Sequence, residues 1–257
     1  MLRWAKHRFQ VGRSATPVEA QHPVYRIPEG ERVYAIGDVH GRFDLLFRLL
    51  STIRGQEKAR PPARTTIVMI GDLIDRGPES AAVVQFVSSW TQPWAKMVVL
   101  KGNHEAKLIS LLEGQSVRLS DWLKMGGAET LQSYGLSDDM LRTAQTGVLI
   151  EAARSAIPVP HQQWLRSLPS HWACGDYQFV HAGVKPGLSI ERQSDRDYLV
   201  SGMSFSTAKR IMGELSFMVI LFSKPSNIGQ IELASIRALG KAGDSRRLGS
   251  RRATSGS

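Results

Sequence analysis

Four short strings in this sequence combine metal-ligating side chains with glycine. They are Gly-Asp-Val-His-Gly at 37–41, Gly-Asp-Leu-Ile-Asp-Arg-Gly at 71–77, Gly-Asn-His-Glu at 102–105 and His-Ala-Gly at 181–183. This mixed oxygen and nitrogen donor set suits Mn, Fe or Zn better than Mg or Ca. Two such ions about 3.5–4 Å apart can clamp the attacking and leaving oxygens of an in-line displacement at phosphorus. The strings therefore predict metal-dependent hydrolysis of phosphate esters.

The spacing of the ligands predicts how they share two metals. Asp38 and His40 alternate at the end of one strand, so both side chains can reach one metal. Asp72 follows the next strand and is the natural bridge between the metals. Asn103 ligates through its neutral amide oxygen, and His181 reaches the second metal. We therefore expect a dinuclear site built from these five residues.

The residues beside the ligands predict the remaining chemistry. His104 follows Asn103 in the chain and can protonate the leaving oxygen. Asp75 can hold the imidazole of His104 in one tautomer, and Arg76 can grip two phosphoryl oxygens with its planar guanidinium. Each piece alone has a structural alternative, such as a surface ion pair of Asp75 with Arg76. The joint occurrence of all four strings favours a catalytic site.

The hydrophobic pattern around the strings predicts the elements that position them. Apolar runs predict strands, and amphipathic periods predict helices between them. The strands are expected at 33–36, 66–70 and 97–100, and the helices at 44–53, 78–88 and 105–112. This alternation implies a parallel sheet with right-handed crossovers, whose ligand sites lie at the carboxyl ends of the strands.

The rest of the chain falls into three parts. Residues 1–30 resemble a flexible basic leader, rich in Pro, Gln and Arg. Within the domain at 31–199, residues 115–175 are expected to form a helical insertion that shapes the rim of the site and sets the substrate. A strand at 177–180 then delivers His181. Residues 200–257 show no clean period and are expected to form an irregular basic tail.

Composition excludes several classes of protein. The 257 residues are 42% hydrophobic and 22% charged, and no apolar run is long enough to span a membrane. The net charge is +10, but residues 27–199 carry 19 basic and 19 acidic side chains, so the excess lies in the two ends. We therefore expect no specific nucleic acid partner and no membrane. The single cysteine, Cys174, and the lack of a secretory signal are consistent with a cytoplasmic protein. The oligomeric state is not predicted.

Over residues 31–199 these strings resemble the phosphoprotein phosphatase family of calcineurin-like metallophosphoesterases, in particular its bacterial serine/threonine phosphatase branch. Three flanking segments strengthen the resemblance. They are Phe-Asp-Leu-Leu at 43–46, Trp122 with Gly126-Gly127, and Phe-Val-His-Ala-Gly-Val at 179–184. The resemblance implies an α/β fold, with a metallophosphoesterase-type β-sheet core and flanking helices.

The resemblance also implies a role for each residue of the site. Asp38, His40, Asp72, Asn103 and His181 would be metal ligands, and His104 would be the general acid, with Asp75 as its partner. Arg76 would bind phosphate. Lys101 stands where the family often has arginine, so we expect it to contact the substrate as a less rigid point charge.

The resemblance implies two divalent metal ions, with Mn favoured over Fe or Zn. The expected reaction is hydrolysis of phosphate monoesters, and the leading candidate substrates are proteins that carry phosphoserine or phosphothreonine. One alternative is the symmetrical hydrolysis of diadenosine tetraphosphate, by a branch with the same motifs. The other is a non-catalytic relative that binds phosphorylated ligands.

One departure from the family concerns the end of the chain. The family completes its second metal with the histidine of a Gly-His-Thr or Gly-His-Ser loop, but no histidine follows His181 here. At a one-base offset, permitted codons for residues 216–221 spell Val-His-Gly-His-Thr, and those for 234–239 spell Ile-Asp-Thr-Gly-Ala. We therefore hypothesise a frameshift near residues 199–200. On this hypothesis the tail is out of frame, the closing strands are missing or disordered, and activity is impaired.

Overall fold

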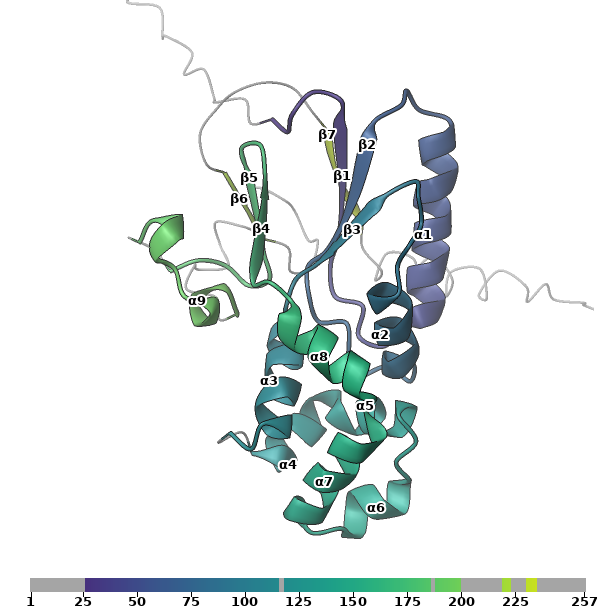
Figure 1. Cartoon of the computed structure of the whole chain (residues 1–257), viewed down its shortest axis with the longest axis vertical. Coiled ribbons are helices and arrows are strands. Elements are labelled where there is room, and N and C mark those ends of the chain that lie inside the picture. Colours follow the sequence, from purple (N-terminus) through teal and green to yellow (C-terminus); the bar gives the residue numbers. More distant parts are fainter. Residues whose placement is uncertain (1–25, 116–117, 186–187, 200–218, 223–229, 235–257) are drawn as a thin grey trace, which may run out of the picture.

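A four-stranded parallel sheet forms the centre of the protein (Figure 1). The computed structural model describes residues 26–115, 118–185, 188–199, 219–222 and 230–234. The strand order is β3–β2–β1–β7, with β1 at Glu31–Ile36, β2 at Arg64–Met69, β3 at Lys96–Val99 and β7 at Gln230–Ala234. The predicted α/β class, with a parallel sheet and flanking helices, is confirmed.

The register of the sheet brings the predicted loops to one edge. Ile36 at the end of β1 pairs with Met69 at the end of β2, and Met69 pairs with Val99 at the end of β3. The three strands therefore stop at the same level. The loops that carry the first three strings start from this edge, as expected for parallel strands.

Both faces of the parallel sheet are covered. Tyr34 and Ile36 of β1 belong to a buried cluster shared with the helices, whereas Val33 and Ala35 belong to a second cluster that contains Phe179. Because successive strand residues point to opposite faces, all four side chains are buried. A continuous apolar strand is the pattern of a parallel sheet buried on both sides.

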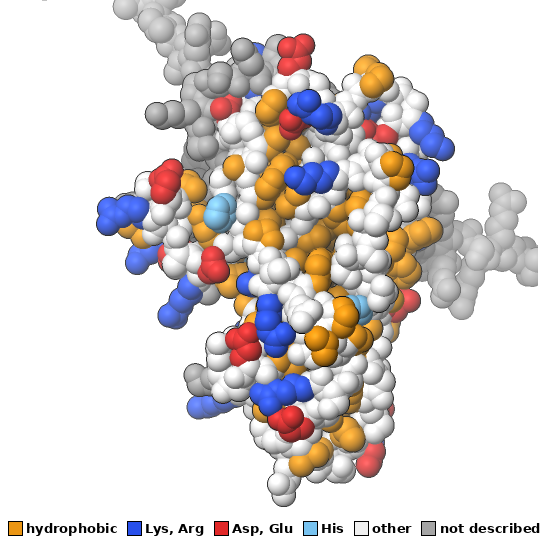
Figure 2. All heavy atoms as spheres, viewed as in Figure 1, with side chains coloured by type: hydrophobic (Ala, Val, Ile, Leu, Met, Phe, Trp, Pro, Cys, Tyr) orange, Lys and Arg blue, Asp and Glu red, His pale blue; other side chains and the backbone are white. Residues whose placement is uncertain are grey.

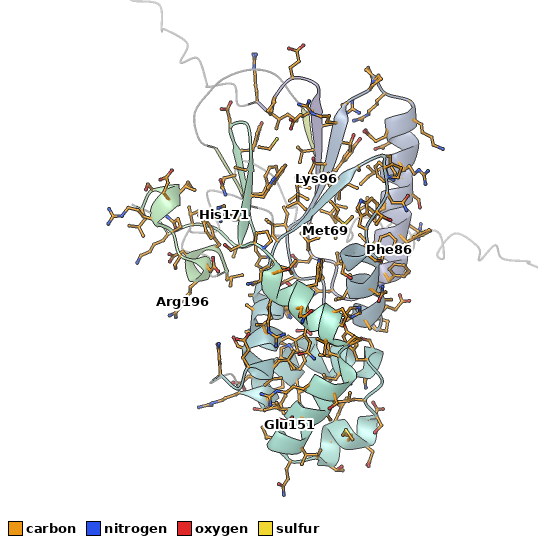
Figure 3. All side chains as sticks on the ribbon, in the orientation of Figure 1. Met69, Phe86, Lys96, Glu151, His171 and Arg196 are labelled. Carbon is orange, nitrogen blue, oxygen red and sulfur yellow. The ribbon has the colours of Figure 1, made fainter. Side chains whose placement is uncertain are left out.

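Helices α1 (Phe43–Lys58), α2 (Ser80–Ser88) and α3 (Asn103–Leu112) follow the three loops. The predicted apolar stripe of α1 is buried, at Leu45, Leu46, Leu49, Leu50 and Ile53. Met69 of β2 belongs to the cluster that this stripe joins, and the partly buried Phe86 of α2 packs against it; both are labelled in Figure 3. The carboxyl end of α1 lies beside the amino ends of β1 and β2 (Figure 1).

The opposite face of the parallel sheet packs against a small antiparallel sheet. Its order is β4–β5–β6, with β4 at His171–Cys174, β5 at Tyr177–Val180 and β6 at Val219–Phe222. Cys174 and Phe179 pack with the residues of β1 and β2 on this face. The strand at 177–180 was expected from the sequence, but β4 was not.

A group of short helices lies beyond the carboxyl edge of the parallel sheet (Figure 1). They are α4 (Leu119–Trp122), the kinked turn η1 (Leu123–Gly127), α5 (Ala128–Ser133), α6 (Asp138–Thr143), α7 (Thr146–Ala156) and α8 (Val159–Ser167). Two further short helices, η2 (Ile190–Arg192) and α9 (Asp195–Leu199), follow β5. A helical insertion over residues 115–175 was expected from the sequence. This prediction was wrong for residues 171–174, which form β4 and pair with β5.

The expectation that closing strands are missing needs correction at two segments of the tail. β6 pairs antiparallel with β5, and β7 pairs parallel with β1. Apolar and β-branched residues dominate Val-Ile-Leu-Phe at 219–222, and such sequences readily extend an open sheet edge. Residues 1–25 of the leader and the other residues after 199 lie outside the described part, and the frameshift stays a hypothesis.

The edge of β3 that pairs with no strand in the described part of the chain borders a groove of about 580 Å³, lined in part by Trp90, Lys96 and Trp164. Hydrophobic side chains gather on this face of the molecule (Figure 2). The groove is separate from the predicted ligands, none of which lines it. Within the described part of the chain, no helix has both the length and the apolar character needed to cross a membrane.

Candidate dinuclear metal centre

Backbone contacts join the loops at the carboxyl edge. The N–H groups of Val39 and His40 donate to the Asp72 carbonyl at 3.0 and 2.9 Å. A Cβ atom on Gly71 would lie 2.5 Å from the backbone nitrogen of Gly102. Only glycine allows this approach, so the glycines of the strings hold two loops in direct backbone contact.

Four predicted site residues have left-handed backbone conformations. The φ angles are 46° at His40, 51° at Asp72, 72° at Asp75 and 68° at Arg76, and these are the non-glycine residues with positive φ among those the structure describes. Such a conformation costs about 1–2 kcal/mol per residue. Strain concentrated in this way is typical of functional sites, where the surroundings hold it in place.

The two predicted histidine ligands are anchored by backbone carbonyls. Nδ1–H of His40 donates to the Ile74 carbonyl at 2.9 Å, and Nδ1–H of His181 donates to the Ile70 carbonyl at 2.7 Å. We assign the Nδ1–H tautomers from these carbonyls, since a carbonyl only accepts. Each Nε2 then carries a lone pair, which is the state in which a neutral imidazole binds a metal.

These lone pairs face other acceptors rather than donors. His40 Nε2 is buried without a hydrogen-bond partner, and it lies 3.6 Å from Oδ2 of Asp38 and 3.8 Å from Oδ2 of Asp72. His181 Nε2 lies 2.9 Å from Oδ1 of Asn103 and 3.4 Å from Oδ1 of Asp72. Lone pairs that face one another repel, and a cation bound between them would remove this repulsion. The donor set therefore fits a bound metal ion.

The ligands form two overlapping groups. Asp38, Asp72 and His181 bring ligand atoms within 4.8 Å of one another, and so do His40, Asp72 and His104. Burial raises the pKa of Asp38, and repulsion from Asp72 raises it further; burial lowers the pKa of His40. Both shifts disfavour the charged forms. These residues could therefore hold two divalent ions, with Asp72 in contact with both.

His104 and Asp75 form a buried pair beside these groups. Nδ1–H of His104 donates to Oδ2 of Asp75 at 2.6 Å, and the two side chains are 1% and 0% exposed. Burial by itself lowers the pKa of His104, but the hydrogen bond to Asp75 and the charges of Asp72 and Asp75 outweigh it and raise the pKa. Nη2 of Arg76 lies 3.3 Å from Nε2 of His104.

Glu105 organises the second loop, a role that the sequence analysis did not assign. Its carboxylate accepts from the backbone N–H groups of Asp72, Leu73 and Gly102 at 2.9, 2.8 and 2.8 Å. Burial raises the pKa of Glu105 to about 7, and repulsion from Asp72 adds to the rise. A Glu three residues after a helix cap is a capping-box pattern, so Gly102–Glu105 contained a signal for this residue.

The group of short helices from α4 to α8 contacts the His104–Asp75 pair through two residues, Trp122 of α4 and Thr130 of α5. The indole Nε1–H of Trp122 donates to Oδ2 of Asp75 at 2.8 Å. The hydroxyl of Thr130 donates to Oδ1 of Asp75 at 2.6 Å. Trp122 was recognised only as part of a family-like flank, and Thr130 was missed because no local pattern relates it to Asp75.

The structure brings Asp38, His40, Asp72, Asn103 and His181 together. It also places Asp75, Arg76 and His104 beside them. Lys101 differs from these residues. Its Nζ donates to the Arg166 carbonyl at 3.5 Å, toward α8. A substrate contact by Lys101 therefore stays a prediction.

The family model of the calcineurin-like phosphoesterases matches residues 31–203. A symmetrical bis(5′-nucleosyl)-tetraphosphatase from Chromobacterium violaceum is 31% identical over 160 residues, which are 62% of this chain and 46% of that protein. The protein of the same name from Methylococcus capsulatus is 32% identical over 160 residues, covering 62% and 45%. The chain thus spans about half the length of the curated relatives it matches.

Among solved structures, a cold-active protein tyrosine phosphatase is similar at 19% identity, with a TM-score of 0.37. The similarity covers 72% of this chain and 54% of that one.

Proposed function

This chain belongs to the calcineurin-like phosphoesterase family, and we propose that it hydrolyses the tetraphosphate bridge of symmetrical bis(5′-nucleosyl) tetraphosphates. The observation that carries a hydrolytic function is the pair of ligand groups that share Asp72 beside the buried His104–Asp75 pair. The choice of substrate is supported by the names of the relatives from Chromobacterium and Methylococcus. The predicted cytoplasmic location is part of the same proposal.

A phosphoserine or phosphothreonine protein is the second candidate substrate. The observation that favours it is Trp122 with Gly126-Gly127, the segment that resembles the bacterial serine/threonine phosphatases. Both substrates require the same cleavage of a P–O bond, so the two candidates share one site and one set of residue roles.

The metal ligands would be Asp38 and His40 around one ion and Asn103 and His181 around the second, with Asp72 within reach of both. When bound, divalent ions of the Mn, Fe or Zn type supply Lewis-acid polarisation of phosphoryl oxygens and make an attacking water more acidic.

The remaining side chains bind phosphate and move a proton. Arg76 has a planar guanidinium beside His104 and would hold two phosphoryl oxygens. Water adds to phosphorus as the P–O bond to the leaving group breaks, and the proton on Nε2 of His104 passes to the leaving oxygen. The proton lost by water goes to solvent, from which His104 recovers its own. Asp75 holds Nδ1–H throughout and keeps the ring oriented.

The composition of residues 182–257 bears on the second metal site. No histidine follows His181, so the ligand that the family takes from its Gly-His-Thr or Gly-His-Ser loop is absent from the sequence. The second ion should then bind weakly. Excess Mn is therefore part of the assay.

The test compares two substrates with the full chain and added Mn. Diadenosine tetraphosphate should yield two molecules of ADP, counted by chromatography, faster than a phosphothreonine peptide yields phosphate. The Asp72→Asn variant should lose this turnover. Asp44→Asn should not, because Asp44 is an exposed carboxylate paired with Arg42. Preference for the peptide would establish the second candidate. Binding of either substrate without turnover above Asp72→Asn would refute hydrolysis and leave a non-catalytic binding protein.

A further inference from the structure

The Asp75 carboxylate is held by donors on both of its oxygens. Oδ2 accepts from His104 and from the indole of Trp122, and Oδ1 accepts from the hydroxyl of Thr130. We propose that Trp122 and Thr130 are positioning residues, which fix the plane of this carboxylate and thereby aim Nε2 of His104 into the site. The inference rests on the proposed function and assigns the group of short helices from α4 to α8 a part in it.

The contacts leave the Asp75 carboxylate one orientation. A carboxylate with a single partner turns easily about its Cβ–Cγ bond, because this torsion is broad. Here rotation would break the Trp122 bond of 2.8 Å or the Thr130 bond of 2.6 Å. Asp75, Trp122 and Thr130 are each 0% exposed, so water cannot replace a lost donor. The fixed Oδ2 in turn fixes the ring of His104, whose Nδ1–H points at it.

Thr130 holds Asp75 through the backbone as well. Its hydroxyl oxygen accepts from the Asp75 N–H at 2.8 Å, an N–H that Ser80 Oγ shares at 3.1 Å, while its proton goes to Oδ1 of Asp75. Asp75 has a φ of 72°, a strained conformation for a residue with a side chain. The Thr130 hydroxyl therefore contacts both the backbone and the side chain of the residue that orients His104.

The kinked turn between Trp122 and Thr130 fits closely against the same loop. The Gly126 carbonyl accepts from the N–H of Arg76 at 3.0 Å, and Gly126 has a φ of 106°. A Cβ atom on Gly127 would collide with the indole of Trp122. This turn thus braces the phosphate-binding Arg76 and the partner of the general acid together.

A merely structural role makes a different prediction. Buried indole and hydroxyl groups need acceptors in any protein, so their loss could act only through stability. It would then lower the hydrolysis of every substrate by the same factor. A positioning role instead impairs the hydrolysis of esters whose leaving oxygen needs a proton, because only that step uses the orientation of His104.

The first arm of the test measures kcat and KM in the presence of Mn for two substrates. The leaving oxygen of phenyl phosphate needs a proton, whereas that of p-nitrophenyl phosphate needs little protonation. We expect Trp122→Phe and Thr130→Val to lower kcat for phenyl phosphate roughly 10- to 100-fold, part of the effect of a general acid. The loss for p-nitrophenyl phosphate should be less than about threefold, with KM unchanged. Thr130→Ser keeps the hydroxyl and should restore the wild-type ratio.

Trp90→Phe is the matched control, because Nε1 of Trp90 donates to the Ala95 carbonyl at 2.9 Å, outside the site. It removes one indole hydrogen bond and should leave the ratio of the two substrates unchanged. An equal loss for both substrates in the Trp122 and Thr130 variants would overturn the positioning role.

The second arm does not depend on turnover. In protein labelled with ¹⁵N-histidine, the Nδ1–H proton of His104 should give a protected signal, assigned by its absence in His104→Asn. We expect Trp122→Phe and Thr130→Val to speed its exchange with water by about tenfold or more, and Trp90→Phe to leave it unchanged. An unaltered signal in both variants would overturn the inference. Faster exchange in a protein without turnover would support positioning and refute the proposed hydrolysis.

Discussion

The two ends of the parallel sheet place carboxylates in opposite electrostatic surroundings. At the amino end, Glu57 of α1 accepts hydrogen bonds from Arg32 at 2.8 Å, from Tyr34 at 2.6 Å and from Thr65. Burial by itself raises the pKa of Glu57, but these hydrogen bonds outweigh it and lower the pKa. The charge of this carboxylate is satisfied within the protein.

At the carboxyl end, acids and lone pairs face one another instead. Burial and the neighbouring Asp72 raise the pKa of Asp38, and His40 Nε2 is buried without a partner. Asp38 and Asp72 repel each other here, and no described residue donates a hydrogen bond to His40 Nε2. The comparison shows two roles for buried polar groups. Glu57, whose hydrogen bonds are satisfied, stabilises the fold, whereas the fold holds the unsatisfied cluster of Asp38, His40 and Asp72 in place for an external cation.

Asp72→Asn should have the largest effect on activity, because it removes the carboxylate that both groups of ligands share. Removing the shared carboxylate should lower Mn-dependent kcat/KM by more than about 100-fold, beyond the loss typical of residues that only support ligands. Without metal, the variant should be no less stable than the parent, because it relieves repulsion with Asp38. The measurements are kinetics in Mn and urea unfolding in EDTA. A variant that is less stable in EDTA but fully active in Mn would show that Asp72 stabilises the fold and does not bind the catalytic metals.

Glu105→Gln tests whether the fold holds the unsatisfied cluster in place. Both carboxylate oxygens accept from backbone N–H groups, so the amide NH₂ of Gln would face a donor, which should cost about 1–3 kcal/mol of unfolding free energy. The loop that carries Asp72 should loosen, which should weaken Mn binding roughly 10- to 100-fold by calorimetry. Unchanged Mn affinity, despite lower stability, would show that the loop keeps its shape without Glu105.

Glu57→Gln should show the reverse pattern at the satisfied end. It should lose about 1–2 kcal/mol of unfolding free energy at neutral pH and keep Mn-dependent activity. Because the folded pKa of Glu57 lies below its ordinary value of 4.5, its contribution is complete above pH 4.5 and disappears as the pH falls through the folded pKa. Urea unfolding from pH 7 to pH 3 should therefore show the parent and variant converging in acid. A gap that widens in acid would contradict the assignment.

Lys101→Ala should have the smallest effect. Its ammonium group donates to the Arg166 carbonyl rather than to the acidic cluster, so the loss in kcat/KM should be less than about fivefold. Arg76→Ala should cost more, since its guanidinium lies beside His104. A larger loss for Lys101→Ala in the same assay would mean that Lys101 turns into the site and binds phosphate.

Local patterns were enough to predict much of the fold and the site. Apolar runs gave β1 to β3, and glycine beside Asp38, Asp72 and Asn103 indicated loops at one edge of the sheet. Parallel register alone brings such loops together, so their convergence needed no long-range information.

The missed features depend on contacts between distant residues. Thr130 lies 55 positions from Asp75, and Trp122 lies 47 positions away, so no periodicity links them. The direction of Lys101 depends on Arg166, 65 positions away. β4 is four residues long, and its strand character comes from pairing with β5 rather than from its own sequence.

Anomalous diffraction from crystals soaked in MnCl₂ tests the central claim most directly. We predict Mn density on both sides of Asp72, one peak near Asp38 and His40 and a second near Asn103 and His181. The two peaks should lie about 3.5–4 Å apart. The absence of Mn density at Asp72, with these side chains ordered as described, would contradict the dinuclear metal centre and the hydrolytic function built on it.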